Sequence, residues 1–152
     1  MSRKSIWAEK SGLENLRNIL AGREAFEDPM GQTLNIALVA VAKGVVSFEG
    51  TPGQHHLNPR GSVHGGWAMS IMDSAAVLAV VSALPKGKLC ATSTFEIKFA
   101  RPIKVGMTCR AEGEVVSQGS NLAHAKAKLI DCDTGKLLAF CTCSASVFDI
   151  DE

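Results

Sequence analysis

The stretch that decides the fold reads Asn58-Pro59-Arg60-Gly61-Ser62-Val63-His64-Gly65-Gly66-Trp67-Ala68-Met69-Ser70-Ile71-Met72-Asp73. A polar loop passes through two glycines into an apolar segment that contains one carboxylate, Asp73. From Gly66 to Ala83 apolar residues occupy every face of a helical wheel, which is typical of a helix buried all round. The segment 84–87, Leu-Pro-Lys-Gly, then ends the helix. We therefore predict a central helix around which the rest of the chain packs.

Strand-like segments precede and follow this helix in the sequence. Before it, residues 33–50 are rich in Val, Ile and Leu and are broken at Lys43-Gly44, which predicts two strands and a tight turn. After it, turn residues separate four further predicted strands: Cys90–Phe99, Thr108–Ser117, Leu122–Ile130 and Lys136–Phe148. Near the N-terminus, leucine and isoleucine recur at helical spacing within residues 6–25, before Asp28-Pro29 interrupts the pattern. This predicts a short amphipathic helix.

The order of these elements indicates an α+β fold in which an antiparallel sheet wraps around a long buried central helix. We predict a helical extension over residues 1–30 and a single domain over residues 31–152, a usual domain size. Strands of this length leave a sheet edge exposed, and pairing with a second copy of the chain would cover it.

The charge of the chain argues against a nucleic-acid partner. The formal net charge is +1, with 16 basic and 15 acidic residues spread along the whole length, so no basic patch indicates nucleic acid or an anionic membrane. The longest apolar run, around residues 75–81, is shorter than the roughly 20 residues of a membrane span. We therefore expect a small-molecule ligand and no membrane partner.

The cysteines indicate a reducing compartment. Five cysteines are an odd number, and Met1-Ser2-Arg3-Lys4 is followed by a mixed polar segment rather than the apolar run of a secretion signal. We expect a cytoplasmic location. Neither the histidines nor the pair Cys141 and Cys143 follow the spacing of a zinc motif, so we expect no metal.

Gly65 and Gly66 stand where the loop becomes the helix. Their N–H groups are among the unpaired donors of the first turn and could polarise a bound carbonyl oxygen, although two glycines could also simply permit a tight turn. Asp73 shares its helix face with apolar residues, where an ionised carboxylate costs free energy without a partner. It could be structural, bonded to Ser70, or functional. An oxyanion site and a base together indicate acyl transfer or hydrolysis.

Helix geometry separates these two groups. Eight residues at 1.5 Å rise place Gly65 and Asp73 about 12 Å apart, too far for both to reach one acyl carbon. We therefore predict a site shared across a homodimer, with Gly65 of one subunit facing Asp73 of the other.

The run from His56 to Gly66, with Asp73 following, resembles the hotdog-fold acyl-CoA thioesterases of the phenylacetate-pathway (PaaI-like) type. The strand that ends in Arg101-Pro102 and the hairpin at Asp133–Ala139 are also similar to this family. The similarity spans about residues 33–148. It implies a hotdog fold, a thioester substrate, a homodimer that pairs into a dimer of dimers, and no cofactor.

The resemblance also implies roles for individual residues. Asp73 corresponds to the catalytic carboxylate, as nucleophile or as general base toward water, and Gly65 to the oxyanion N–H. Asn58 corresponds to the side chain that orients the thioester or the water, and Thr92 to a hydroxyl that assists the water. His64 precedes the glycines as in the family.

Three of these residues also have plain structural explanations. His64 could cap the helix, Asn58 could serve the turn before Pro59, and Thr92 could be an ordinary strand residue. We expect Thr92 to lie on the polar face of its strand together with Thr94, Glu96 and Lys98.

Substrate-binding residues are expected in two places. We predict an acyl pocket lined by Gly66, Trp67, Met69 and Met72, compatible with an aromatic ring or a medium chain. The turn at residues 117–121 is neutral where many relatives carry Arg or Lys. Phosphate contacts could therefore come from the N–H groups of Gly119 and Ser120, or from Arg60, Arg101 or Lys104. Both coenzyme A and acyl carrier protein are therefore retained as alternatives for the carrier of the acyl group.

The candidate residues and the family resemblance together favour hydrolysis of an acyl or aroyl thioester. A non-catalytic acyl-CoA-binding protein would keep the pocket without needing Asp73. A hydroxyacyl-thioester dehydratase is disfavoured because its His-Phe-Pro pattern near the helix is missing.

Overall fold

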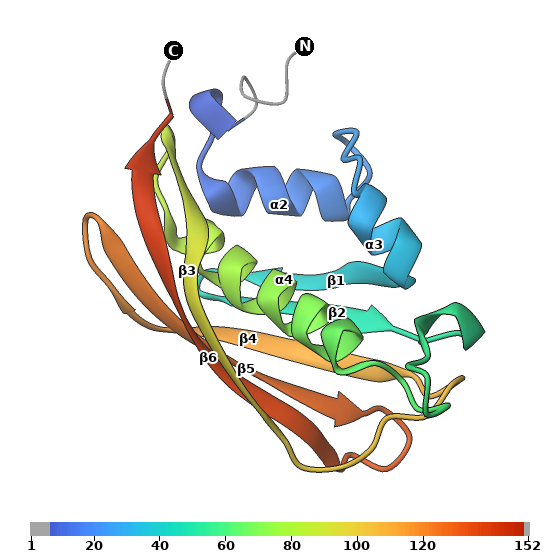
Figure 1. Ribbon diagram of the computed structural model, residues 1–152. Coiled ribbons are helices and arrows are strands. Elements are labelled where there is room, and N and C mark those ends of the chain that lie inside the picture. Colours follow the sequence, from blue (N-terminus) through green and yellow to red (C-terminus); the bar gives the residue numbers. More distant parts are fainter. Residues whose placement is uncertain (1–6, 151–152) are drawn as a thin grey trace.

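In the computed structural model, which describes residues 7–150, six strands form one sheet that curves around helix α4 (Gly65–Ala83) (Figure 1). The strands are β1 (Ile36–Ala42), β2 (Val45–Gly50), β3 (Lys88–Phe99), β4 (Cys109–Gln118), β5 (Leu122–Asp131) and β6 (Leu137–Asp149). Their order in the sheet is β1-β2-β4-β5-β6-β3, and every neighbouring pair is antiparallel. The predicted α+β hotdog fold, with a helix wrapped by an antiparallel sheet, is confirmed.

Small side chains bring α4 close to the sheet. Gly113 of β4 lies directly under the helix, because a Cβ added there would be 2.2 Å from the carbonyl oxygen of Ala75. Most inward positions of β5 and β6 are also small and buried: Ala123, Ala125, Ala127, Ala139, Cys141, Cys143 and Ala145. The alternation of small buried and polar exposed residues therefore sets the distance between helix and sheet.

One face of α4 is only partly covered by this chain, contrary to the prediction of a helix buried all round. The less buried residues between positions 65 and 78, here called the open stripe, are Gly65, Gly66, Met69, Ser70, Asp73, Ser74, Val77 and Leu78. Strand β3 reaches this stripe, while strands β2, β4 and β5 and helix α2 also pack against α4 (Figure 1). A helical wheel shows which residues are apolar but not what covers them, so the pattern alone could not show this face.

Helix α4 is more apolar as a whole than its longest uninterrupted apolar run indicated. Within residues 7–150 it is the one helix that is long and apolar enough to cross a membrane by length and composition. More than half of that window, 56%, is buried inside the protein, which is typical of a core helix.

Helix α2 (Gly12–Leu20) is shorter than the predicted helix over residues 6–25, whose first residue lies outside the described part. The Ser11 side chain accepts a hydrogen bond from the Glu14 N–H (3.3 Å), and the Glu14 carboxylate accepts one from the Ser11 N–H (3.0 Å). This capping box sets the start of the helix at Gly12.

A second short helix, α3 (Pro29–Leu34), follows where the sequence pattern indicated an interruption and then a strand. The Asp28 carboxylate accepts a hydrogen bond from the Gly31 N–H (2.9 Å), and Pro29 occupies the first helical position, where no N–H is needed. The predicted boundary between residues 30 and 31 therefore falls inside a helix.

Strand β3 forms one edge of the sheet and contains a bulge. Thr92 pairs with Ala145 and Thr94 with Ser144, so Ser93 is an extra residue that shifts the register. Thr92 consequently lies on the side of the strand that faces α4, whereas Thr94 faces outward. The prediction that Thr92 shares one polar face with Thr94, Glu96 and Lys98 is wrong, because the bulge breaks the alternation on which it rested.

Candidate active site

The first turn of α4 has one N–H group without a partner among residues 7–150, that of Gly65. The Gly66 N–H donates to Nδ1 of His64 (2.9 Å), and the Trp67 N–H donates to the carbonyl oxygen of His64 (3.0 Å). The Gly65 N–H therefore stands at the positive end of the helix dipole, available to a carbonyl oxygen. Gly66, predicted to bind substrate, has its N–H engaged in the cap.

His64 acts as the N-cap of α4. Its backbone is extended (φ −62°, ψ 134°), and its ring accepts the hydrogen bond from Gly66 through an unprotonated Nδ1. This hydrogen bond supports the structural explanation of His64 as a helix cap.

Replacing His64 by alanine should lower the free energy of unfolding by about 1 kcal/mol, since the cap is lost. His64→Asn should recover most of that stability and most of kcat, because asparagine is a strong N-cap residue. Chemical denaturation and steady-state kinetics on the three proteins measure both. Restored stability with kcat still lost would instead show that the imidazole takes part in the chemistry.

Asp73 and Thr92 meet between α4 and β3. The Thr92 hydroxyl donates to Oδ1 of the partly buried Asp73 carboxylate (2.8 Å). The bulge at Ser93 is what turns Thr92 toward the helix, so two residues that are 19 positions apart form one unit. Within the described part of the chain, Oδ2 of Asp73 has no hydrogen-bond partner and is left to act on another group.

Thiols surround the carboxylate on the sheet side. Burial is the main cause that raises the pKa of Cys90 to about 12 and that of Cys141 to about 11, and the negative charge of Asp73 is a smaller cause in both. Burial and then Asp73 also raise the pKa of Cys143. These cysteines therefore stay protonated and neutral at physiological pH and do not compete with Asp73 as nucleophiles.

Asn58 uses its side chain within its own loop. Its Oδ1 accepts from the N–H groups of Arg60 (2.9 Å) and Ser62 (3.3 Å), and its Nδ2 donates to Oγ of Ser62 (2.8 Å). These bonds are those of a turn, as in the structural explanation of this residue. They hold together the loop that leads into α4.

The predicted acyl-pocket residues point in different directions. Met69 lies on the open stripe and is 40% exposed. Trp67 and Met72 are packed in the core of the chain, and Nε1 of Trp67 donates to the carbonyl oxygen of Leu34 (2.7 Å). Of the three large side chains, only Met69 is presented on the same face as Asp73.

Gly119 and Ser120 lie in the exposed turn between β4 and β5. The Gly119 N–H donates to the carbonyl oxygen of Leu122 (2.8 Å), so it serves the turn. Arg101 holds its guanidinium by donating from Nη1 to the carbonyl oxygen of Leu137 (2.7 Å).

A cavity of about 380 Å³ opens beside the start of α4. Its walls are Ser62, Val63, Gly65, Phe99, Ala100, Arg101, Pro102 and Ile103. Gly65 thus faces a space that can hold part of a ligand, whereas Asp73 is not in these walls. The sequence pattern did not single out Phe99, since the orientation of its side chain depends on the bulge in β3.

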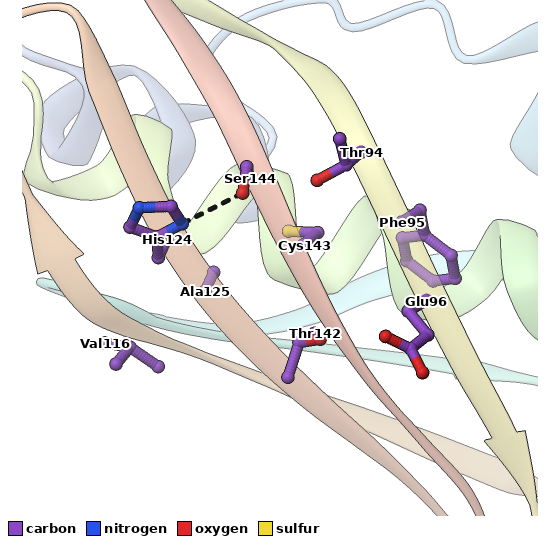
Figure 2. A pocket seen from close by; sticks show the side chains of 9 residues that line it. All are labelled: Thr94, Phe95, Glu96, Val116, His124, Ala125, Thr142, Cys143 and Ser144. Atoms are coloured by element: carbon purple, nitrogen blue, oxygen red, sulfur yellow. Dashed lines mark hydrogen bonds between the residues drawn. The ribbon is translucent and has the colours of Figure 1, made fainter.

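A second hollow, of about 290 Å³, lies on the other face of the sheet (Figure 2). Strands β3, β5 and β6 contribute most of its side chains, and Nδ1 of His124 is 2.9 Å from Oγ of Ser144. It contains none of the predicted site residues. Within residues 7–150 no group of three or more His, Cys, Asp or Glu side chains is placed to hold a metal ion.

The chain is similar in sequence to known proteins. Residues 60–137 match the model of the Thioesterase superfamily. Human acyl-coenzyme A thioesterase 13 is 30% identical over 114 residues, which are 75% of this chain and 79% of that protein. The mouse protein of the same name is 28% identical over 104 residues, 68% of this chain and 74% of its own.

Solved structures agree with these relatives. A putative thioesterase from Ralstonia eutropha, described as a phenylacetic acid degradation-related protein, is 26% identical with a TM-score of 0.77, covering 86% of this chain and 98% of its own. The PaaI protein of the E. coli phenylacetic acid degradation operon is 24% identical and has the same fold, with a TM-score of 0.77, covering 91% and 96%.

A six-stranded antiparallel sheet wrapped around one long helix, together with these matches, defines a protein of the hotdog thioesterase class. The chain belongs to the thioesterase superfamily. Within it, the protein is a PaaI-like hotdog thioester hydrolase.

Proposed function

We propose that this protein hydrolyses acyl-CoA thioesters to the free acid and coenzyme A, in a site shared between two subunits. One observation carries the proposal: Gly65 and Asp73 both lie on the open stripe of α4, each with a hydrogen-bonding group that has no partner among residues 7–150, but about 12 Å apart along the axis. A second subunit is therefore needed to bring an N–H and a carboxylate to one acyl carbon.

In this mechanism the Gly65 N–H binds the thioester carbonyl oxygen and stabilises the negative charge that develops on it. Asp73 of the opposite subunit either takes a proton from water, which attacks the carbonyl carbon, or attacks that carbon itself. The carbon–sulfur bond then breaks, and the thiolate leaves and takes up a proton. With Asp73 as nucleophile, water afterwards hydrolyses the acyl-enzyme anhydride. Thr92 donates to Oδ1 of Asp73 in either case and so directs Oδ2 toward the substrate.

The uncovered surfaces support a dimer of this kind. β3 is an edge strand of 12 residues that pairs with β6 on one side and with no described strand on the other, and it contacts the open stripe through Thr92 and Asp73. Exposed sheet edges are normally covered, and a two-fold axis would pair β3 with its copy. Met69 lies midway between Gly65 and Asp73, so two antiparallel α4 helices that cross near Met69 would place each Gly65 opposite the other Asp73. Pairing of two such dimers into a tetramer stays a prediction.

The substrate carrier and the location are also proposals. The name of the human relative, an acyl-coenzyme A thioesterase, supports coenzyme A as the carrier. Arg60, Arg101 and Lys104 remain candidates for phosphate contacts. All five cysteines are free thiols, which supports a cytoplasmic location.

A thiol-release assay on a panel of aroyl- and medium-chain acyl-CoAs tests this function. We expect free coenzyme A at a rate proportional to enzyme concentration. Thermal stabilisation by acyl-CoA without thiol release would indicate a binding protein instead, and loss of water from a 3-hydroxyacyl-CoA would indicate a dehydratase.

A further inference from the structure

Phe99 occupies an unusual position at the end of the edge strand β3. It is 53% exposed, although it lies on the side of the strand that faces α4. The Ser93 bulge produces this orientation. After the bulge, Phe95, Ile97 and Phe99 pair with residues of β6 whose side chains are buried under α4, and Phe99 itself pairs with Ala139.

The ring of Phe99 lies against the first residue of α4. A Cβ added at Gly65 would be 2.9 Å from Cζ of Phe99 and 3.6 Å from both Cε atoms, so the tip of the ring points at the glycine. Any side chain at position 65 would push the ring away. The close packing of Phe99 therefore favours glycine at position 65, in addition to any role of the Gly65 N–H group.

Phe99 also forms part of the wall of the cavity beside Gly65. The apolar ring is thus placed beside Gly65, the residue whose N–H is the one of the first helical turn without a partner among residues 7–150. Excluding water beside a donor strengthens the hydrogen bond that it makes to a developing charge.

We infer that Phe99 is a positioning residue, whose ring shields the Gly65 N–H from water and holds the thioester carbonyl against it. The inference rests on the proposed oxyanion role of Gly65. The ring makes no bond in the reaction, so its removal should affect the transition state more than the binding of substrate.

The test compares Phe99→Ala and Phe99→Leu with Phe140→Ala in the full-length protein. Phe140 is a matched control: it is 46% exposed, pairs with Lys98 and lies on the outer face of β6. For Phe99→Ala we expect kcat to fall about 10-fold, a fraction of the roughly 10²- to 10³-fold loss typical of a missing oxyanion donor, with KM changed less than about threefold. Phe99→Leu should recover part of kcat, and Phe140→Ala should match the unmodified protein.

A double substitution adds a readout that a general loss of stability would not give. Gly65→Ala alone should lower kcat because its Cβ displaces the ring. In the Phe99→Ala background the same change should have little further effect, since nothing is left to displace. Additive losses would contradict the contact as the cause.

Two outcomes would overturn the inference: a Phe99→Ala enzyme with unchanged kcat, or a loss explained by dissociation of the oligomer in size-exclusion chromatography. Failure of the proposed function would look different, because the unmodified protein would then release no thiol or Asp73→Asn would remain active.

Discussion

Asp73→Asn should lower kcat by about 10²- to 10⁴-fold, the range typical of lost general base catalysis. The asparagine oxygen can still accept the hydrogen bond that Thr92 gives to Oδ1, so the local geometry should survive while the charge is removed. Steady-state thiol release with the best acyl-CoA of the panel measures the effect. Circular dichroism and size-exclusion chromatography should show an unchanged fold and assembly.

Two comparison variants sharpen this result. Thr92→Val keeps the shape of the side chain but removes the bond to Asp73, and should cost less than Asp73→Asn because the carboxylate remains. Asp149→Asn removes an exposed carboxylate that pairs with Lys88 on the surface, and should leave kcat unchanged. An Asp73→Asn enzyme with more than about a tenth of the original kcat would rule out Asp73 as the base or nucleophile.

Gly65→Pro should lower kcat by about 10²- to 10³-fold, since proline removes the N–H that binds the oxyanion. The helix should tolerate it, because proline is favoured at the first helical position and the extended backbone of His64 suits a residue before proline. Gly65→Ala is the control: it also places a Cβ against Phe99 but keeps the N–H. The difference in kcat between these two variants therefore isolates the donor.

Mixing Gly65→Pro and Asp73→Asn subunits tests the shared site. In a mixed dimer one site would combine the intact Gly65 of one chain with the intact Asp73 of the other, and the second site would carry both changes. Random exchange at equal amounts should then restore about a quarter of the original activity, since half the dimers are mixed and each has one working site. No recovery after demonstrated subunit exchange would place both groups in one chain.

Some features of the site follow directly from the order of residues. The glycines before an apolar segment correctly predicted the start of α4 near Gly65. The spacing from Gly65 to Asp73 requires about 12 Å on any α-helix, so the prediction of a site shared between two subunits could be made without knowledge of the sheet. The six strands are recognisable because Val, Ile and alternating polar residues stand between clear turn residues.

Other features depend on contacts between residues far apart in the chain. The bulge at Ser93 arises from the way in which β3 pairs with β6. Because of the bulge, both Thr92 and Phe99 face α4, where Thr92 contacts Asp73 and Phe99 contacts Gly65. Local alternation, which assumes an unbroken strand, therefore put Thr92 on the wrong face. Helix α3 was also missed, because Asp28-Pro29 can end one helix or begin another.

By itself the sequence determined the local elements, the class of fold and the presence of a donor and a carboxylate on one helix, because these follow from short-range periodicity and helix geometry. The tertiary structure alone decided that His64 caps α4, that Trp67 and Met72 turn into the core while Met69 stays on the open stripe, and that Phe99 closes over Gly65. These outcomes depend on strand register and on which face each neighbouring element covers, and both are set by packing across the whole chain.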